Sequence, residues 1–355
     1  MSALLKTARQ QAQWSIHQRR QGRRWAMIAG LAVLALLAVV WDIGSGPSTL
    51  KGMDVLIGLW RPDHLPRGLQ VVLWDVRLPV ALMAVLVGAS LALAGTEMQT
   101  ILGNPLAEPF TLGVSSSAAL GAALAIVLDW GIPGMAPVWI VSGNAFVFAV
   151  GAMALLQLLS RWSGAQAQTL VLFGIAIGFT AGALLSLVQF VASEDALQQL
   201  VFWSMGSLAR ADWQSVAVMA GVLALVLPFS WRAGHSLTAL RLGDERAHSF
   251  GINVASLRRW TLVRISLLAA VAVGFVGTIG FVGLVGPHVA RMLVGEGHRH
   301  LLPASAVVGA IMMSLASVVS KALIPGILLP VGIVTALVGL PVFMSLILRR
   351  GGRVS

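Results

Sequence analysis

The feature that most constrains this chain is a series of long apolar stretches that recurs along the whole sequence. A helix needs about 20 apolar residues to cross the hydrocarbon core of a bilayer. Ten stretches come close to that length, at residues 25–43, 78–98, 112–129, 136–159, 169–192, 213–231, 260–281, 284–297, 303–323 and 330–348. Because 57% of the residues are hydrophobic and only 10% are charged, a soluble fold could not bury this apolar surface. The sequence therefore predicts an all-α polytopic membrane protein with about ten transmembrane helices.

The distribution of basic residues predicts how these helices are oriented. An even number of spans places both ends of the chain on one side of the membrane. If that side is the cytoplasm, eighteen of the 24 Lys and Arg residues fall in cytoplasmic segments and six in outer ones, in agreement with the positive-inside rule. We therefore expect a basic cytoplasmic tail over residues 1–24, one ten-helix domain over 25–348 and a cytoplasmic tail over 349–355. Most of the net charge of +11 is then explained by the orientation of the helices in the membrane, and nucleic acid is not an expected partner.

The sequence lacks the usual signatures of catalysis. It contains no cysteine, no G-x-x-x-x-G-K-[ST] phosphate-binding loop and no H-E-x-x-H metal motif. His298 and His300 flank Arg299, which is a poor arrangement for a metal. The triplet Leu242-Gly243-Asp244 lies in a polar loop and lacks the leading glycine of the aspartyl intramembrane proteases. We therefore expect no catalytic, cofactor-binding or metal-binding residue in this chain, and no enzyme activity of its own.

Charged residues inside the predicted spans are scarce. Glu97, Arg264 and Arg291 lie near the inner ends of their spans, where we expect the side chains to snorkel toward the interface. Without a carboxylate at mid-membrane, a proton- or sodium-coupled carrier lacks its usual parts. An ATP-independent carrier is thus an alternative that the sequence disfavours.

The segment 274–287, GFVGTIGFVGLVGP, has a glycine at every third position and ends in a proline. Such spacing lets neighbouring helices approach closely, but the glycines and the proline also weaken a helix. The segment is therefore either a tightly packed helix face or a bend beside a cavity, where irregular backbone is tolerated. Gly280, Gly283, Gly286 and Pro287 are the candidate bend residues.

Two inner segments are candidates for function. Residues 104–109, NPLAEP, form a turn framed by two prolines. In the second segment, 237–259, three leucines predict a short helix that ends at Gly243, and Asp244 can cap a second short helix. Two such helices with apolar and charged faces suit a docking surface for another protein. An interfacial loop with positive-inside arginines explains the composition equally well.

Five motifs occur in a fixed order along the chain. They are Arg77-Leu78-Pro79, GASLALAGTEMQTILGNPLAEPFTLGVSSSAALG at 88–121, ALRLGDERAHSFGIN at 239–253, GFVGLVGPHVAR at 280–291 and LPVGIVTALVGLPVF at 329–343. In register from about residue 75 to 348, they resemble the FecCD/BtuC family, the permease subunits of ATP-binding-cassette (ABC) importers for iron chelates, heme and cobalamin. The resemblance implies the BtuC-like fold of type II ABC importers and a homodimer in the bacterial inner membrane. It also implies two cytoplasmic ATPase subunits, which would bind ATP and magnesium, and a periplasmic binding protein.

The resemblance also assigns roles to residues. A coupling loop at 235–259 would contact the ATPase through Leu240, Arg241, Leu242, Gly243, Asp244, Glu245, Arg246, Ala247 and Gly251. A cytoplasmic gate would comprise Asn104, Pro105, Leu106, Ala167 and Gln168. Arg77 and Lys321 would pair with acidic residues of the binding protein.

Two positions depart from the family pattern near the outer side. The usual R-L-P-R reads Arg77-Leu78-Pro79-Val80, and the common E-L-P before the last helix reads Leu328-Leu329-Pro330. Both departures alter the expected contact with the binding protein. Arg61 and Arg67 are the candidates to compensate.

The resemblance leaves heme, ferric siderophores and cobalamin as possible substrates. A strongly anionic ferric catecholate favours basic residues along its path, and the predicted spans offer none at mid-membrane. An apolar path suits a flat amphipathic molecule such as heme. We therefore expect import of heme or another iron chelate by alternating access, with a ferric siderophore or cobalamin as the alternative.

Overall fold

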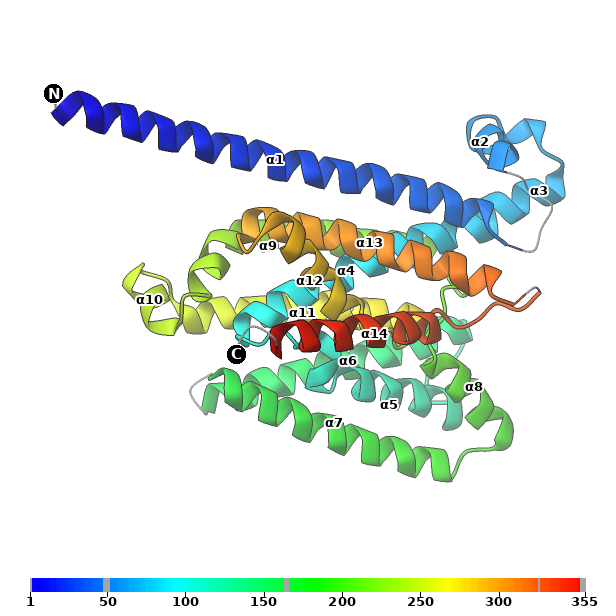
Figure 1. The fold of residues 1–355 in the computed structure, drawn as a ribbon. Coiled ribbons are helices and arrows are strands. Elements are labelled where there is room, and N and C mark those ends of the chain that lie inside the picture. The colour runs from blue at the N-terminus through cyan, green and yellow to red at the C-terminus, as the bar shows by residue number, and fades with distance from the viewer. Residues whose placement is uncertain (1, 47–51, 163–165, 325, 352–355) are drawn as a thin grey trace.

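The computed structural model describes residues 2–46, 52–162, 166–324 and 326–351, and the regular structure of these residues is helical (Figure 1). The ten predicted stretches correspond to α1 (Ser2–Gly44), α4 (Leu78–Ile101), α5 (Val114–Val127), α6 (Pro137–Trp162), α7 (Ala167–Phe190), α9 (Trp213–Leu240), α11 (Val254–Val276), α12 (Val282–Val294), α13 (His298–Ala322) and α14 (Val331–Gly351). Within the described part of the chain, seven helices are long and apolar enough to cross a membrane, and α5, α12 and the described part of α14 are shorter apolar helices. The prediction of an all-α polytopic membrane fold is confirmed.

Short helices join the spans at the two ends of the bundle. At one end, α2 (Gly52–Trp60), η1 (Pro62–His64), α3 (Arg67–Val71) and η2 (Val72–Arg77) lead into α4, and α8 (Glu194–Ser204) follows α7. At the other end, α10 (Asp244–Ser249) separates α9 from α11. The short helix η3 (Pro109–Leu112) precedes α5 and packs inside the bundle against α7. In Figure 1, α1 begins and α14 ends toward the end that carries α10. This arrangement agrees with the predicted even number of crossings.

The core is built around α4, most of whose residues are buried. α4 packs against α9, α11, α12 and α13, while α5 packs against α6 and α7 in the lower part of Figure 1. Gly88 faces the backbone of Gly309, and Gly95 faces that of Gly283, so closely that a β-carbon at either position would collide with the opposite backbone. Small residues hold these helices together because lipid offers no hydrophobic drive for helix association.

The structure corrects the expectation for two charged residues in the spans. Glu97 on α4 is fully buried, and the Nε atom of Arg264 on α11 donates to its Oε1 atom at 3.0 Å. Arg264 also donates to the hydroxyl of Thr261 at 2.9 Å. The prediction that these two side chains snorkel to the interface is wrong, because each neutralises the other inside the bundle.

The long helix α9 corrects a second expectation. Its N-terminus is fixed by a capping box between Asp212 and Ser215, and it continues past the predicted end at residue 231 to Leu240. Leu237 therefore belongs to the last turns of α9 and not to a separate short helix. The consequence is a continuous helical connection from a membrane span to the segment predicted to contact the ATPase.

Candidate functional site

The predicted coupling loop forms an exposed turn and a short helix at one end of the bundle. α9 ends at Leu240, the chain turns through Gly243, and α10 begins at Asp244. Leu240 and Ala247 are buried and hold the segment against the bundle, whereas the other side chains between them, and those up to Phe250, are exposed. The segment therefore offers a surface of charged and apolar side chains, including a half-exposed Leu242, to another molecule.

The backbone of this loop requires glycine at two positions. Gly243 has φ of +103° and Gly251 has φ of +78°, and no atom would crowd a β-carbon at either one. The requirement is thus conformational, because L-residues with a side chain rarely adopt positive φ. Gly243 is the residue that precedes α10, so the prediction that Asp244 caps this helix is wrong. Asp244 and Glu245 lie in its first turn, where their negative charge favours the helix dipole.

The carboxylate of Asp244 is held by Arg258 on α11. The two terminal nitrogens of Arg258 donate to the two carboxylate oxygens at 2.8 and 2.9 Å, a bidentate pairing. The Nε atom of the same arginine donates to the carbonyl oxygen of Ile101 at 3.1 Å. One guanidinium thus ties the coupling loop to the end of α4, which leads into the predicted gate.

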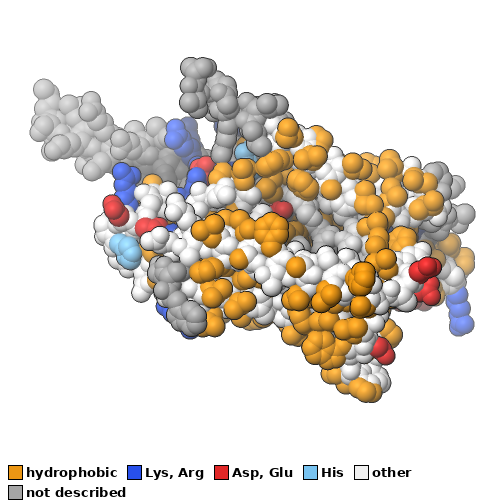
Figure 2. Space-filling view, turned by 90° about the horizontal axis from the view of Figure 1, so that it is seen from below, with side chains coloured by type: hydrophobic (Ala, Val, Ile, Leu, Met, Phe, Trp, Pro, Cys, Tyr) orange, Lys and Arg blue, Asp and Glu red, His pale blue; other side chains and the backbone are white. Residues whose placement is uncertain are grey.

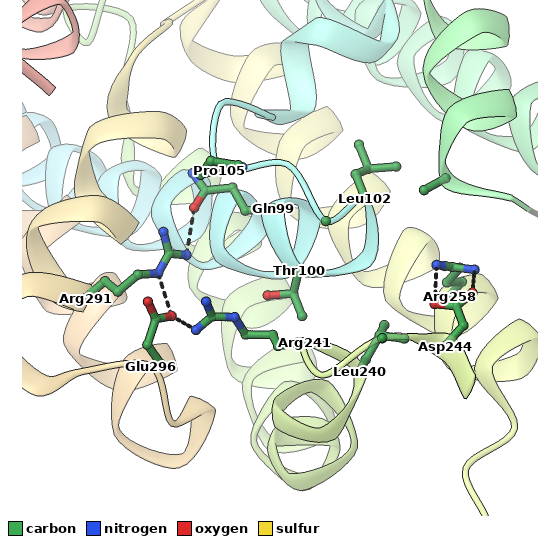
Figure 3. Close-up of a pocket in the computed structure, with 13 residues that line it drawn as sticks. Gln99, Thr100, Leu102, Pro105, Leu240, Arg241, Asp244, Arg258, Arg291 and Glu296 are labelled. Carbon is green, nitrogen blue, oxygen red and sulfur yellow. Dashed lines mark hydrogen bonds and ion pairs between the residues drawn. The ribbon is translucent and has the colours of Figure 1, made fainter. Parts of the chain in front are cut away.

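The predicted gate and the coupling loop meet at one cavity of about 390 Å³ (Figure 3). Pro105 from the turn after α4 and Ala167 from the start of α7 line it. The lining also includes Leu240, Arg241, Gly243 and Asp244 from the loop. Two segments that are far apart in the sequence, and that were expected to act in the same process, therefore share a cavity.

The other three predicted gate residues lie outside the lining of this cavity. Asn104, Leu106 and Gln168 are exposed. The side-chain oxygen of Asn104 accepts a hydrogen bond from the backbone N–H of Leu106 at 2.9 Å, which fixes the turn after α4. Asn104 is therefore placed to shape the turn, and Leu106 and Gln168 present exposed side chains beside the cavity-lining residues Pro105 and Ala167.

The glycine-rich segment contains both a break and a packing face. The helical path is interrupted between α11 and α12, where Gly277 has φ of +77° and Phe281 has φ of +69°. Gly280 lies in this break, whereas Gly283, Gly286 and Pro287 lie inside α12. A β-carbon on Gly286 would come within 2.9 Å of the β-carbon of Ala92, so this glycine serves close packing. The bend interpretation therefore applies to the part before α12, which contains Gly280, and the packing interpretation applies to Gly286 inside α12.

The break is held by Glu108, a residue that the sequence analysis did not single out. Its Oε2 atom accepts a hydrogen bond from the backbone N–H of Phe281 at 3.2 Å. Burial raises the pKa of Glu108 from its ordinary value of 4.5 to about 7, and the hydrogen bond from Phe281 partly opposes this rise. Glu108 follows the predicted gate turn, so this carboxyl group links the gate to the break between α11 and α12.

Two of the predicted docking residues are buried at the outer end. The ammonium group of Lys321 on α13 contacts the Oδ1 atom of Asp42 on α1 at 2.7 Å, and Arg77 donates to the carbonyl oxygen of Ile43 at 2.8 Å. In this structure both charges are engaged by groups of the chain itself. Direct pairing of either residue with a binding protein stays a prediction, and it would require these contacts to open. Arg61 and Arg67 are exposed there.

The two departures from the family pattern lie close to these charges. Val80 and Leu328 line one cavity of about 310 Å³ together with Arg77 and Lys321. The two apolar substitutions therefore affect a single site at the outer end. Asp42, which sequence reasoning also missed, supplies the counter-charge beside this site.

The missed residues share one signal that the sequence carried. The chain has only 13 acidic residues, and an acid next to an apolar stretch requires a partner when it is buried. Asp42 and Glu108 fit that description, and so does Glu97, which the sequence analysis named but without its buried pairing to Arg264. The sequence alone does not name the partner, because each contact joins segments that are distant along the chain.

Comparisons with known proteins agree with this architecture. The hemin transport system permease protein HmuU of Yersinia pestis is 38% identical over 320 residues, which cover 90% of this chain and 95% of HmuU. The vitamin B12 import system permease protein BtuC of Citrobacter koseri is 34% identical over 341 residues, covering 95% of this chain and 97% of BtuC. A solved metal-chelate type ABC transporter in an inward-facing conformation matches with a TM-score of 0.80 and 32% identity, over 91% of this chain and 99% of that one.

The model of the FecCD transport family matches residues 33–349, which include α4 to α13 and both the loop and the gate described above. The agreement of the sequence motifs, the helical membrane fold and these relatives leads to one conclusion. The chain is a membrane-embedded permease that belongs to the FecCD transport family.

Proposed function

We propose that the chain is the transmembrane subunit of an ATP-driven ABC importer that moves heme or another iron chelate into the cytoplasm by alternating access. The shared cavity of the coupling loop and the gate carries this proposal. A partner that pushes on the exposed loop acts on a segment joined to the gate through Arg258 and Ile101. Hydrolysis of ATP is assigned to partner subunits, because the sequence has no phosphate-binding loop.

The choice of substrate is supported by the relatives and by the chemistry of the helices. HmuU is a hemin permease, BtuC a vitamin B12 permease, and the matching solved structure a metal-chelate transporter. The chain has no tyrosine, and the exposed side of α7 is mostly apolar, with Leu172, Phe179 and Leu187. A weakly polar path suits passage of a flat amphipathic chelate. Ferric siderophores and cobalamin are the alternatives within the same family.

The proposed assembly is a homodimer that carries two ATPase subunits inside and a binding protein outside. Figure 2 shows apolar side chains spread over the face seen from below, where α7 lies. On α7 the exposed hydroxyl groups of Thr180 and Ser186 donate to carbonyl oxygens of their own helix, at 2.9 Å and 3.0 Å, so this face can pack against a second copy without leaving a polar group unpaired. The basic tail before residue 25 supports placing both ends of the chain in the cytoplasm of a bacterial inner membrane.

Contact with the binding protein is assigned to Arg61 and Arg67 at the exposed outer end. Arg77 and Lys321 then act indirectly, by fixing α1, α4 and α13 in place. Charge reversal of Arg61 and Arg67 together should weaken capture of the binding protein and reduce the salt dependence of that capture. Unchanged capture would contradict this assignment.

The test of the proposed function is uptake into proteoliposomes. The complex with its ATPase is reconstituted with ATP inside and the cognate binding protein outside, and heme, a ferric siderophore and cobalamin are offered in parallel. We expect ATP-dependent accumulation of heme or of a ferric chelate. Accumulation of cobalamin alone would change the substrate, and uptake that does not need ATP would overturn the importer assignment.

A further inference from the structure

A line of polar contacts crosses the cytoplasmic cavity from the coupling loop to the end of α4 (Figure 3). It begins at Arg241, directly after α9, whose Nη1 atom contacts the Oε2 atom of Glu296. The same carboxylate oxygen lies 3.2 Å from the Nε atom of Arg291 on α12. Arg291 in turn donates from Nη2 to the side-chain oxygen of Gln99 on α4 at 2.9 Å. Four side chains thus join the loop, the turn after α12, α12 itself and α4.

We propose that Glu296 is a positioning residue that transmits movement of the coupling loop to the gate end of α4. The inference rests on the proposed function, since it assumes that an ATPase moves the loop. In this proposal Glu296 binds neither substrate nor ATP. It acts through Arg241 and Arg291, which its carboxylate holds together.

The electrostatics of the cavity support this role. One carboxylate lies between two guanidinium groups, so its removal leaves two positive charges facing each other. The side chain of Arg241 is 34% exposed, and its partial burial lowers the pKa of this cation, which favours a counter-charge beside it. The side chain of Glu296 is itself 55% exposed, so solvent screens each single contact. The arrangement is therefore suited to fixing geometry more than to adding stability.

A second contact between the coupling loop and α4, made by Arg258, strengthens the inference. Arg258 reaches the carbonyl oxygen of Ile101, while Arg291 reaches the side chain of Gln99 two residues earlier. In Figure 3 the pair of Asp244 and Arg258 lies on one side of this part of α4, and the pair of Arg291 and Glu296 lies on the other. Two contacts on opposite sides of α4 would carry a displacement of the loop to the end of this helix. With a single contact, the helix end could rotate about that contact and would not follow the loop. The gate residue Pro105 follows a few positions later.

The test measures how well ATP hydrolysis is coupled to transport in the complete complex of permease, ATPase and binding protein, and not the stability of the permease. The variants are Glu296→Gln, Arg241→Gln, the two combined, and Glu296→Asp. Arg299→Gln is the matched control, because Arg299 is an exposed cation three positions after Glu296. Two readouts are taken: chelate transported per ATP hydrolysed, and the nucleotide-dependent labelling rate of a Leu106→Cys gate residue. The chain has no native cysteine, so this label is specific within the permease.

We expect Glu296→Gln to retain the complex and its basal ATPase activity but to reduce transport per ATP about tenfold. Arg241 also belongs to the surface assigned to the ATPase, so Arg241→Gln should reduce transport per ATP at least as much. The double variant should be no worse than Arg241→Gln alone, because both changes remove the same link. Glu296→Asp should restore part of the coupling. Transport per ATP within about twofold of the Arg299→Gln control, or additive losses, would overturn the proposal. Loss of thermal stability and of the assembled complex in Glu296→Gln would also overturn it, since that result assigns a purely structural role.

The two proposals fail in different ways. If the wild-type complex hydrolyses ATP but accumulates none of the chelates, the substrate assignment fails. The labelling rate of Leu106→Cys still reads the link through Glu296 in that case. A nucleotide-dependent change of labelling that persists in Glu296→Gln contradicts the link, and its disappearance supports it.

Discussion

Arg258 on α11 binds the carboxylate of Asp244 on α10 with both terminal nitrogens and the carbonyl oxygen of Ile101 on α4 with its third. One side chain therefore fixes the exposed helix of the coupling loop to the end of the most buried helix in the bundle. Arginine suits this position because its planar guanidinium presents several donors in a fixed geometry. Lysine, with a single ammonium group, could satisfy only part of the same set of acceptors.

The first prediction concerns this arginine. Arg258→Lys should keep the positive charge but lose the bidentate geometry, so transport should fall more than assembly of the complex does. The stability cost should be about 1 kcal/mol, since Asp244 is half exposed and solvent screens its pairing. Transport and thermal unfolding are measured beside Arg259→Lys, whose side chain is exposed at the next position. Equal transport by the two variants would show that the geometry at Arg258 does not matter.

The second prediction concerns the buried pair at the outer end. Asp42→Asn leaves the ammonium of Lys321 buried without its counter-charge, and Arg77 lies close by. Breaking a buried ion pair from one side costs about 3–5 kcal/mol. A large drop in the unfolding midpoint in detergent is therefore expected, with partial recovery in the double variant Asp42→Asn plus Lys321→Met. Asp63→Asn, at an exposed position of η1, is the control. A drop no larger than that of the control would mean that the pair contributes little.

The third prediction is a pH dependence. The pKa of Glu108 is about 7 in the folded protein and ordinarily 4.5, so the folded state holds this proton more tightly than the unfolded chain. The protonated carboxyl of Glu108 therefore contributes fully to the stability of the folded state below pH 4.5, and this contribution is lost as the pH rises to about 7. Wild type should lose more stability between pH 5 and pH 8 than Glu108→Gln, whose amide oxygen can still accept the N–H of Phe281. The exposed Glu194→Gln is the control, and a wild-type slope equal to that of Glu108→Gln would refute the prediction.

The fourth prediction concerns helix packing. A β-carbon at Gly95 would collide with the backbone of Gly283, which cannot move as a flexible side chain can. Gly95→Ala should therefore destabilise the protein by about 1–3 kcal/mol through overpacking. Gly30→Ala in α1, where nothing lies within 4 Å of the new atom, should be neutral or slightly stabilising. Thermal unfolding of the two variants distinguishes these effects, and equal midpoints would contradict the packing described for α4 and α12.

Much of the fold followed from the sequence because a bilayer imposes a simple requirement. A span needs a long apolar stretch, and all ten stretches correspond to helices in the structure. The assignments of a coupling loop and a gate came from the family resemblance and stay predictions, and the structure shows that residues of both segments line one cavity. The end of α9 did not follow from the sequence, because polar residues near Arg232 ended the apolar stretch although the helix continues to Leu240.

The pairing of charges could not be predicted from the same local patterns. Asp42 and Lys321 lie 279 positions apart, and Glu97 and Arg264 lie 167 apart. A single sequence shows that each charge is costly in a span but not which partner lies opposite. The apparent docking pair of Arg77 and Lys321 illustrates the point, because only the packing of α1 against α13 revealed that Asp42 covers the lysine.

Movement of the gate in response to nucleotide is measured most directly by the distance between spin labels at Leu106→Cys in the two copies of the proposed homodimer. The chain has no cysteine, so one label per permease can be attached before assembly with the ATPase. If the ATPase drives the gate through the coupling loop, the distance should differ between the nucleotide-free and ATP-trapped complexes. The difference should shrink when Asp244→Lys and Glu245→Lys together disrupt the loop surface. A distance that is the same with and without ATP would contradict ATP-driven alternating access in this permease.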